Sequence, residues 1–422
     1  MGRYTILGGE TDKKIRNKLD VVVNSIRQKI PSTISIILAG SFGYGQGPVK
    51  IEKDKIYPFN DFDIYVISPA KINKELFDDI ATEIAQKLGL KGINYFYKFS
   101  KEEQKLKENF YIDLKVYTLD DWKNLIPRLR YYKFKENSQI LWGEDVRSLA
   151  PTFSLEQIPI SESVKIILDR ASQLIEYYSD NDLKYCDDYL FYIIQQAYAG
   201  CLTAVLLPLG KYEPRYIDSA KVLLRIYQEI VLSKRLPDLD KRIYQFIEWR
   251  MNPQILPDKD IKKIWRRSVQ DILAVLNYVI GNFINESINN PKELSQAIKK
   301  MSKYYHRPYL NELIKRKFKI KMDFFSYFLL LPLNIFFKYR YFLRVKRISK
   351  KSYWRIFLNP TMPDLKIFSI APLFLSIKIN NGDLDKIKLE LGKIYPVKND
   401  NWEELSIDYA NAYIAFFLQK LI

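Results

Sequence analysis

The hydrophobic positions near the N-terminus first follow a helical pattern. A helix is predicted between Thr11, which can cap it, and Pro31, which ends it. Its apolar residues recur every three or four positions: Ile15, Leu19, Val22, Val23 and Ile26. A second helix is predicted further along by another such series: Leu76, Ile80, Ile84 and Leu88. Each series forms one apolar face of its helix.

Strand-like patterns separate and follow these two helices. Strands are predicted at 32–39, 62–67, 93–99 and 110–117, and segment 48–60 predicts either a hairpin or a loop. This alternation of helix and strand patterns predicts an α/β or α+β domain, and we take α+β with a mixed sheet as the expected fold class.

The remainder of the chain follows helical patterns. Amphipathic helices are predicted at 161–178, 185–207, 216–232, 241–250 and 262–284. We therefore expect a catalytic domain at 1–150, a helical bundle at 151–300, and a basic, aromatic-rich helical region at 301–422. Within the bundle, Tyr212, Arg215 and Tyr216 lie in a polar-aromatic segment that either reaches a cleft or forms a surface loop.

Charge and rare residues narrow the chemistry. The 422 residues include 67 Lys and Arg against 49 Asp and Glu, a net charge of +18 that suits an anionic partner. The single histidine, His306, and the two cysteines disfavour histidine catalysis, His/Cys zinc sites and a disulfide framework. Carboxylates are therefore the expected metal ligands, and they favour hard ions such as Mg²⁺. No signal peptide and no long apolar run is evident, so a cytoplasmic location is expected.

Three aspartates occupy the polar face of two predicted strands. Side chains alternate between the faces of a strand, so Asp61 and Asp63 point to one side while Phe62 and Ile64 point to the core. Asp113 has the same position in its own strand. If the strands are neighbours, the three carboxylates converge, and divalent cations can relieve their mutual repulsion.

A glycine-rich turn follows the first predicted strand. It begins with Gly40 and Ser41 and continues to Gly47. Backbone N–H groups in such a turn can face a phosphate, and the Ser41 hydroxyl could add a hydrogen bond. Gly40 and Ser41 are therefore the predicted phosphate-binding residues.

Taken in order, these motifs resemble the nucleotidyltransferases of the DNA polymerase beta superfamily. The resemblance comprises Gly40-Ser41, the Asp61-x-Asp63 pair and Asp113 as the third acidic residue, and covers roughly 30–147. Segment 137–146, with its Trp-Gly-Glu-Asp sequence, resembles the close of the catalytic domain in the minimal and aminoglycoside-type branches. The resemblance implies transfer of a nucleoside monophosphate from an NTP, with ATP expected, using two Mg²⁺ ions held by the three aspartates. It also implies that the helical bundle holds the acceptor.

Branches of this superfamily differ in the length of the spacer and in the acceptor that they modify. Nineteen residues separate Ser41 from Asp61, more than the usual spacer, and an insertion costs little loop entropy. Three classes of acceptor remain open: a small molecule, glycan or lipid-linked group; an RNA end, as in archaeal CCA-adding enzymes; or a partner toxin, as in the minimal nucleotidyltransferase antitoxins. A non-enzymatic binding protein is disfavoured because all three carboxylates are present.

Segment 315–355 carries much of the charge. Its thirteen Lys and Arg residues face Asp323 alone, a net +12, and they flank the apolar segment 324–337. Three interpretations remain open: a core helix with a solvated basic edge, a peripheral element on an anionic membrane, or an RNA-binding surface. The core interpretation predicts that Phe328, Leu329 and Leu331 are buried.

Overall fold

The computed structural model describes residues 2–52, 55–88, 112–178, 187–253, 260–303, 305–318, 325–380, 382–397 and 400–417. Contacts group the chain into two compact units. The first comprises Met1–Ile158, Tyr212–Val222 and Tyr244–Asp258, and the second comprises Pro159–Lys211, Leu223–Ile243 and Lys259–Ile422. The boundary expected near residue 300 lies inside the second unit.

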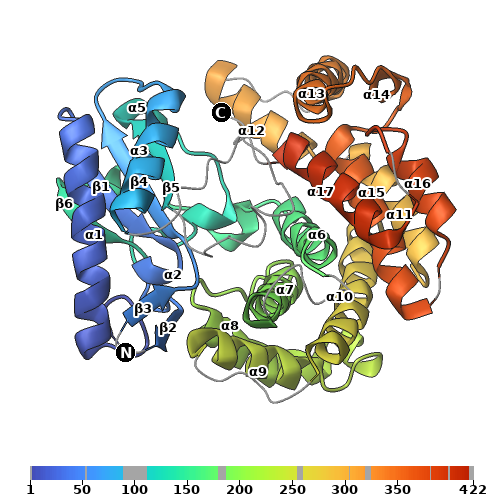
Figure 1. Cartoon of the computed structure of the whole chain (residues 1–422), viewed down its shortest axis with the longest axis horizontal. Helices are drawn as coiled ribbons and strands as arrows, with labels where there is room; N and C mark the ends of the chain where they lie inside the picture. Colours follow the sequence, from blue (N-terminus) through green and yellow to red (C-terminus); the bar gives the residue numbers. More distant parts are fainter. Residues whose placement is uncertain are drawn as a thin grey trace. The chain divides into compact units, whose positions relative to one another are not determined.

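The first unit contains a mixed sheet of four strands in the order β5-β4-β1-β6 (Figure 1). The strands are β1 (Ser35–Ala39), β4 (Phe62–Ser68), β5 (Ile112–Thr118) and β6 (Gln139–Gly143). β1 pairs antiparallel with β4 and β6, and β4 pairs parallel with β5. The α+β class is confirmed, and the strand predicted at 93–99 lies outside the described residues.

Helices cover one face of this sheet. α1 (Gly9–Lys29) and α3 (Lys74–Lys87) bury the apolar series predicted from the sequence against the strands. The expected cap at Thr11 is wrong, because α1 begins two residues earlier. Asp12 instead accepts backbone hydrogen bonds from Tyr4 and Thr5, which folds the N-terminal loop onto the helix.

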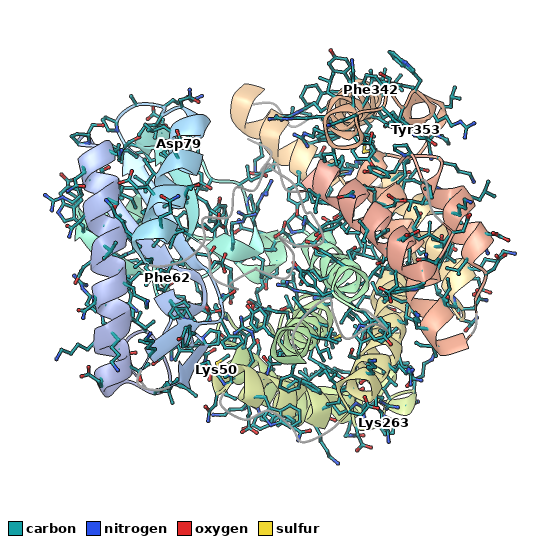
Figure 2. All side chains as sticks on the ribbon, viewed as in Figure 1. Lys50, Phe62, Asp79, Lys263, Phe342 and Tyr353 are labelled. Carbon is teal, nitrogen blue, oxygen red and sulfur yellow. The ribbon has the colours of Figure 1, made fainter. Side chains whose placement is uncertain are left out.

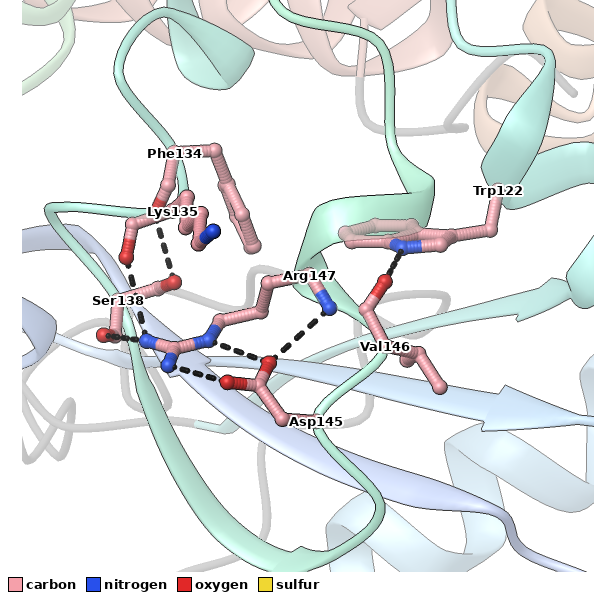
Figure 3. Close-up of polar contacts among 7 residues, drawn as sticks. All are labelled: Trp122, Phe134, Lys135, Ser138, Asp145, Val146 and Arg147. Atoms are coloured by element: carbon pink, nitrogen blue, oxygen red, sulfur yellow. Dashed lines mark hydrogen bonds and ion pairs between the residues drawn. The ribbon is translucent and has the colours of Figure 1, made fainter.

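The other face carries a smaller aromatic core. Tyr65 from β4 packs with Trp122 from the short helix α5 (Leu119–Lys123) and with Phe134. Trp122 donates its indole N–H to the Val146 carbonyl oxygen at 2.8 Å (Figure 3). This core therefore ties segment 122–146 to the sheet.

An ion pair closes the loop around the Trp-Gly-Glu-Asp sequence. Arg147 donates from Nε and Nη2 to the Asp145 carboxylate at 2.8 and 2.7 Å, and from Nη1 to the Ser138 carbonyl oxygen at 2.7 Å (Figure 3). The hydrogen bonds of Arg147 hold the pKa of Asp145 at about 2, against an ordinary value of 3.8. Asp145 is thus a structural residue of this loop.

The second unit is helical. Its helices are α6 (Ser161–Glu176), α7 (Asp187–Leu206), α10 (Ile261–Ile284), α11 (Pro291–Lys300), α12 (Arg307–Phe318), α13 (Phe325–Ser349), α14 (Arg355–Leu358), α15 (Pro363–Asn380), α16 (Leu384–Leu391) and α17 (Trp402–Phe417). The helices α8 (Tyr216–Ile226) and α9 (Leu239–Met251) contribute residues to both units. Among the described residues, no helix is both long enough and apolar enough to cross a bilayer.

A buried polar cluster joins three helices of the second unit. Asp271 of α10 has no exposed surface and accepts hydrogen bonds from Arg242 Nε at 2.8 Å and from the Tyr198 hydroxyl at 2.8 Å. A paired and hydrogen-bonded charge of this kind is tolerated in a core, and removing one partner would leave the other charge uncompensated. We therefore assign this cluster a structural role.

Candidate metal centre

The three predicted aspartates lie together at the N-terminal ends of β4 and β5. Asp63 of β4 is directly opposite Asp113 of β5 in the parallel ladder, and Asp61 precedes β4. Each of the three residues offers a carboxylate oxygen, and these oxygens lie within 4.8 Å of one another. All three residues are partly buried. This arrangement of hard oxygen ligands could hold a divalent cation.

The glycine turn adopts a more compact form than expected. Gly40 to Gly43 form a four-residue helix, α2, instead of an open turn. Gly40 leaves β1 with φ +63°, a backbone conformation that favours glycine. The Ser41 hydroxyl accepts a hydrogen bond from Asn60 Nδ2 at 2.8 Å, which holds this turn against the residue preceding Asp61. The predicted phosphate-binding residues therefore adjoin the carboxylates.

Gly40 is also required by the position of Asp63. A Cβ atom added to Gly40 would lie 2.1 Å from Oδ2 of Asp63, far inside van der Waals contact. The absence of a side chain at Gly40 thus allows the turn to pack directly against a candidate metal ligand.

We expect Gly40→Ala to displace Asp63 and to lower the affinity for Mg²⁺ about tenfold or more. Gly210→Ala is a matched control, because Gly210 has φ +64° but no atom within 4 Å of the added Cβ. Each change should cost about 1–2 kcal/mol of stability from backbone strain. Mg²⁺ titration followed by calorimetry separates the loss of metal affinity from the loss of stability. Equal Mg²⁺ affinity in both variants would contradict the role assigned to Gly40.

The structure adds Lys115 to the site. Its Nζ lies 2.8 Å from Oδ1 of Asp63 and 2.5 Å from Oδ2 of Asp113, and the side chain is 8% exposed. Sequence reasoning missed Lys115, although it lies two positions after Asp113 and alternation therefore places it on the same strand face.

Lys115 remains charged in this position. Burial on its own would lower the pKa of Lys115, but the charge of Asp63 and its hydrogen bond, with a contribution from Tyr65, outweigh burial and raise this pKa above its usual value. One ammonium against three carboxylates leaves a formal charge of −2 at the centre. The residues therefore fit a divalent cation, and Lys115 uses one oxygen each of Asp63 and Asp113.

We expect Lys115→Met to destabilise the metal-free protein by about 3 kcal/mol, because the partly buried carboxylates lose their counter-charge. Mg²⁺ should restore more stability to this variant than to the unmodified protein, since binding to the folded state adds stability by mass action. Urea unfolding with and without Mg²⁺ measures both effects. Lys123→Met, at an exposed position of the same unit, is the control. Unchanged stability of Lys115→Met without metal would contradict the counter-ion role.

The long spacer between Ser41 and Asp61 forms a hairpin. β2 (Val49–Glu52) and β3 (Lys55–Pro58) pair antiparallel as a separate two-stranded sheet. Of the two predictions for 48–60, the hairpin is confirmed. The insertion thus adds an element of its own and leaves Gly40 and Ser41 beside the carboxylates.

All three residues of the polar-aromatic segment belong to the first unit, and Tyr216 lies near the glycine turn. The Tyr216 ring lies 6.5 Å from the Tyr44 ring, and Tyr44 directly follows α2. Tyr212 is buried and packs near Tyr132. Tyr212 is therefore not part of an exposed loop, whereas Arg215 is exposed.

Comparison with known proteins adds no family assignment. No protein-family model matches the chain, and no curated protein shows significant sequence similarity to it. The carboxylate cluster and its surroundings are therefore the features from which we infer a function.

Proposed function

We propose that the chain is a Mg²⁺-dependent nucleotidyltransferase whose first unit is a polymerase-beta-like catalytic domain. The observation that carries the proposal is the cluster of Asp61, Asp63 and Asp113, with ligand oxygens within 4.8 Å, directly beside Gly40 and Ser41. A mixed sheet with acidic residues on adjacent parallel strands also supports a nucleotidyltransferase. NTP, with ATP expected, is the nucleotide substrate.

In this proposal the protein groups bind and orient the reactants. Mg²⁺ ions, when bound, would activate an attacking hydroxyl and stabilise the leaving pyrophosphate. Asp61, Asp63 and Asp113 would hold the metal, and Lys115 keeps two of these carboxylates close together before metal binds. Gly40 and Ser41 would face the phosphates of the nucleotide.

We propose a small molecule, glycan or lipid-linked group as the acceptor, with an RNA end or a partner protein as the alternatives. The test is to incubate the protein with α-³²P-labelled NTPs, Mg²⁺ and separate extracts of small molecules, lipids, RNA and protein. We expect labelled product and equimolar pyrophosphate in the first or second fraction. Label on RNA or protein would move the acceptor to those classes, and no pyrophosphate in any fraction would overturn the proposed activity.

We also propose that helix α13 places the protein peripherally on an anionic membrane. The core interpretation of this segment is wrong for Leu331, which is 67% exposed. Phe328 and Leu329 lie outside the described side chains. Along α13, exposed apolar residues recur every fourth position, forming a stripe: Leu331, Ile335, Tyr339 and Leu343.

Another side of α13 packs against the rest of the second unit. Tyr341 and Val345 are fully buried, and the Tyr341 and Phe416 rings lie 6.0 Å apart. Arg344 donates to the carbonyl oxygens of Ala415 and Phe416 at the end of α17, so this basic residue serves the fold. Figure 2 labels Phe342 on this helix and Tyr353 on the segment that follows.

Basic residues continue the exposed stripe beyond its apolar part. Lys346, Arg347, Lys350 and Lys351 are exposed at the end of α13 and just after it. Trp354 is 67% exposed, and its ring lies 4.6 Å from that of Phe342. Apolar side chains, tryptophan and lysines on one surface are typical of an interfacial helix on anionic lipid. A continuous apolar stripe is less suited to RNA.

A further inference from the structure

Arg250, on the last turn of α9, is buried and forms no ion pair within the described part of the chain. Its side chain is 1% exposed, and its Nε and Nη1 atoms have no hydrogen-bond partner among the described residues. No described carboxylate forms an ion pair with it. A buried guanidinium is costly unless it is paired, so this arrangement indicates a missing anion.

Aromatic rings connect Arg250 to the glycine turn. The Arg250 guanidinium lies 4.8 Å from the centre of the Tyr216 ring, and the Tyr216 ring lies 6.5 Å from that of Tyr44. Tyr44 closes α2, because its N–H donates to the Gly40 carbonyl oxygen at 3.3 Å. All these residues belong to the first unit. Arg250 is therefore close to the turn that adjoins the carboxylates.

Electrostatics agree with this placement. Burial, followed by Tyr216 and Tyr212, raises the pKa of Tyr44 well above its ordinary value. Arg250 acts on this pKa in the opposite direction and Asp63 acts in the same direction, so both charges lie within range of the Tyr44 hydroxyl. The Arg250 guanidinium and the Asp63 carboxylate are therefore both near Tyr44.

We propose that Arg250, with Tyr44 and Tyr216, forms a subsite for a phosphate group beside the carboxylate cluster. A guanidinium matches the geometry of a phosphate through paired N–H donors, and the neighbouring tyrosine hydroxyls can add hydrogen bonds. The phosphate belongs either to the triphosphate of the nucleotide or to a phosphorylated acceptor. This inference rests on the proposed function for the identity of its ligand.

Binding of simple anions to the full chain tests the subsite without requiring any transfer reaction. The probes are sodium tripolyphosphate, inorganic phosphate and ATP, each titrated by calorimetry. We expect Arg250→Gln to weaken tripolyphosphate binding at least tenfold. Arg215→Gln is the matched control, since Arg215 is exposed in the same unit, and it should change binding less than twofold.

The ATP arm identifies the source of the phosphate. A parallel loss of ATP and tripolyphosphate affinity would assign Arg250 to the nucleotide. Unchanged ATP affinity with lost inorganic phosphate binding would assign it to the acceptor. Anion binding through Arg250 without any labelled transfer product would overturn the proposed activity and leave the subsite standing.

Melting temperatures distinguish an anion-binding role of Arg250 from a purely structural one. Arg250→Met removes the buried charge while keeping a long side chain, so without anions its melting temperature should equal or exceed that of the unmodified protein. Tripolyphosphate should raise the melting temperature of the unmodified protein and leave that of this variant unchanged. A lower melting temperature in Arg250→Met, or anion affinities unchanged in folded Arg250→Gln, would overturn the proposal.

Discussion

Asp63→Asn is expected to reduce nucleotidyl transfer by about 1,000-fold or more while the protein stays folded. Asp63 is the central residue of the cluster, since it lies opposite Asp113 and bonds Lys115. Loss of one shared metal ligand removes several kcal/mol of charge stabilisation, and each 1.36 kcal/mol corresponds to a factor of ten in rate. Transfer from labelled NTP onto the acceptor that the extract experiment identifies measures the effect.

The fold should survive because asparagine keeps an oxygen that can accept the Lys115 hydrogen bond. Asp120→Asn is the matched control, since Asp120 is exposed at the start of α5 in the same unit. It should transfer at the rate of the unmodified protein. Circular dichroism and melting temperature establish folding for both variants. Equal transfer by Asp63→Asn and Asp120→Asn would show that the carboxylate cluster does not carry the chemistry.

The aspartate cluster was predictable because strand alternation acts locally. A period of two fixes which face of β4 carries Asp63 and which face of β5 carries Asp113. This period does not determine whether the two strands are neighbours. The structure shows that they are, because Asp63 pairs with Asp113 in the parallel ladder. The same local rule, applied to Lys115, would also have found the counter-ion.

The burial of Arg250 near the glycine turn could not be predicted from the sequence. It lies in an amphipathic helix whose pattern predicts the helix but not which unit it packs against. Its position near Tyr44 depends on contacts between segments far apart along the chain. A buried arginine has the same sequence appearance as a solvated one, so its missing partner is visible only in three dimensions.

The prediction that Thr11 caps α1 was wrong for a related reason. Thr11 has the chemistry of a helix cap, but a cap requires the chain before it to be non-helical. The side chain of Asp12 gathers the N–H groups of the preceding loop, and α1 extends back to Gly9. Local preference was overridden by this contact.

Reversing the basic end of α13 is expected to abolish binding to anionic vesicles. The variant replaces four exposed residues by glutamate: Lys346, Arg347, Lys350 and Lys351. Each basic residue near an anionic surface contributes about 1 kcal/mol, so losing four corresponds to about a 1,000-fold lower partition coefficient. Flotation with phosphatidylserine-containing vesicles at low salt measures it, and neutral phosphatidylcholine vesicles should not float the unmodified protein.

A second charge reversal tests whether net charge suffices. It replaces four exposed basic residues elsewhere in the second unit by glutamate: Lys234, Arg235, Lys263 and Arg266. Both variants change the net charge equally, so the control should still float if α13 is the binding element. Loss of flotation in both would indicate non-specific attraction.

The apolar stripe gives an independent arm of the same experiment. Changing Leu331, Ile335, Tyr339 and Leu343 to serine removes the side chains that would enter the headgroup region, while the basic cluster remains. Because these residues are exposed, the melting temperature should change little. We expect flotation to be lost in this variant too, since charge and apolar contact act together. Flotation unaffected by the serine changes would show that the apolar stripe does not bind the membrane. Retention of single-stranded RNA on filters without any vesicle binding would assign α13 to nucleic acid and overturn the membrane proposal.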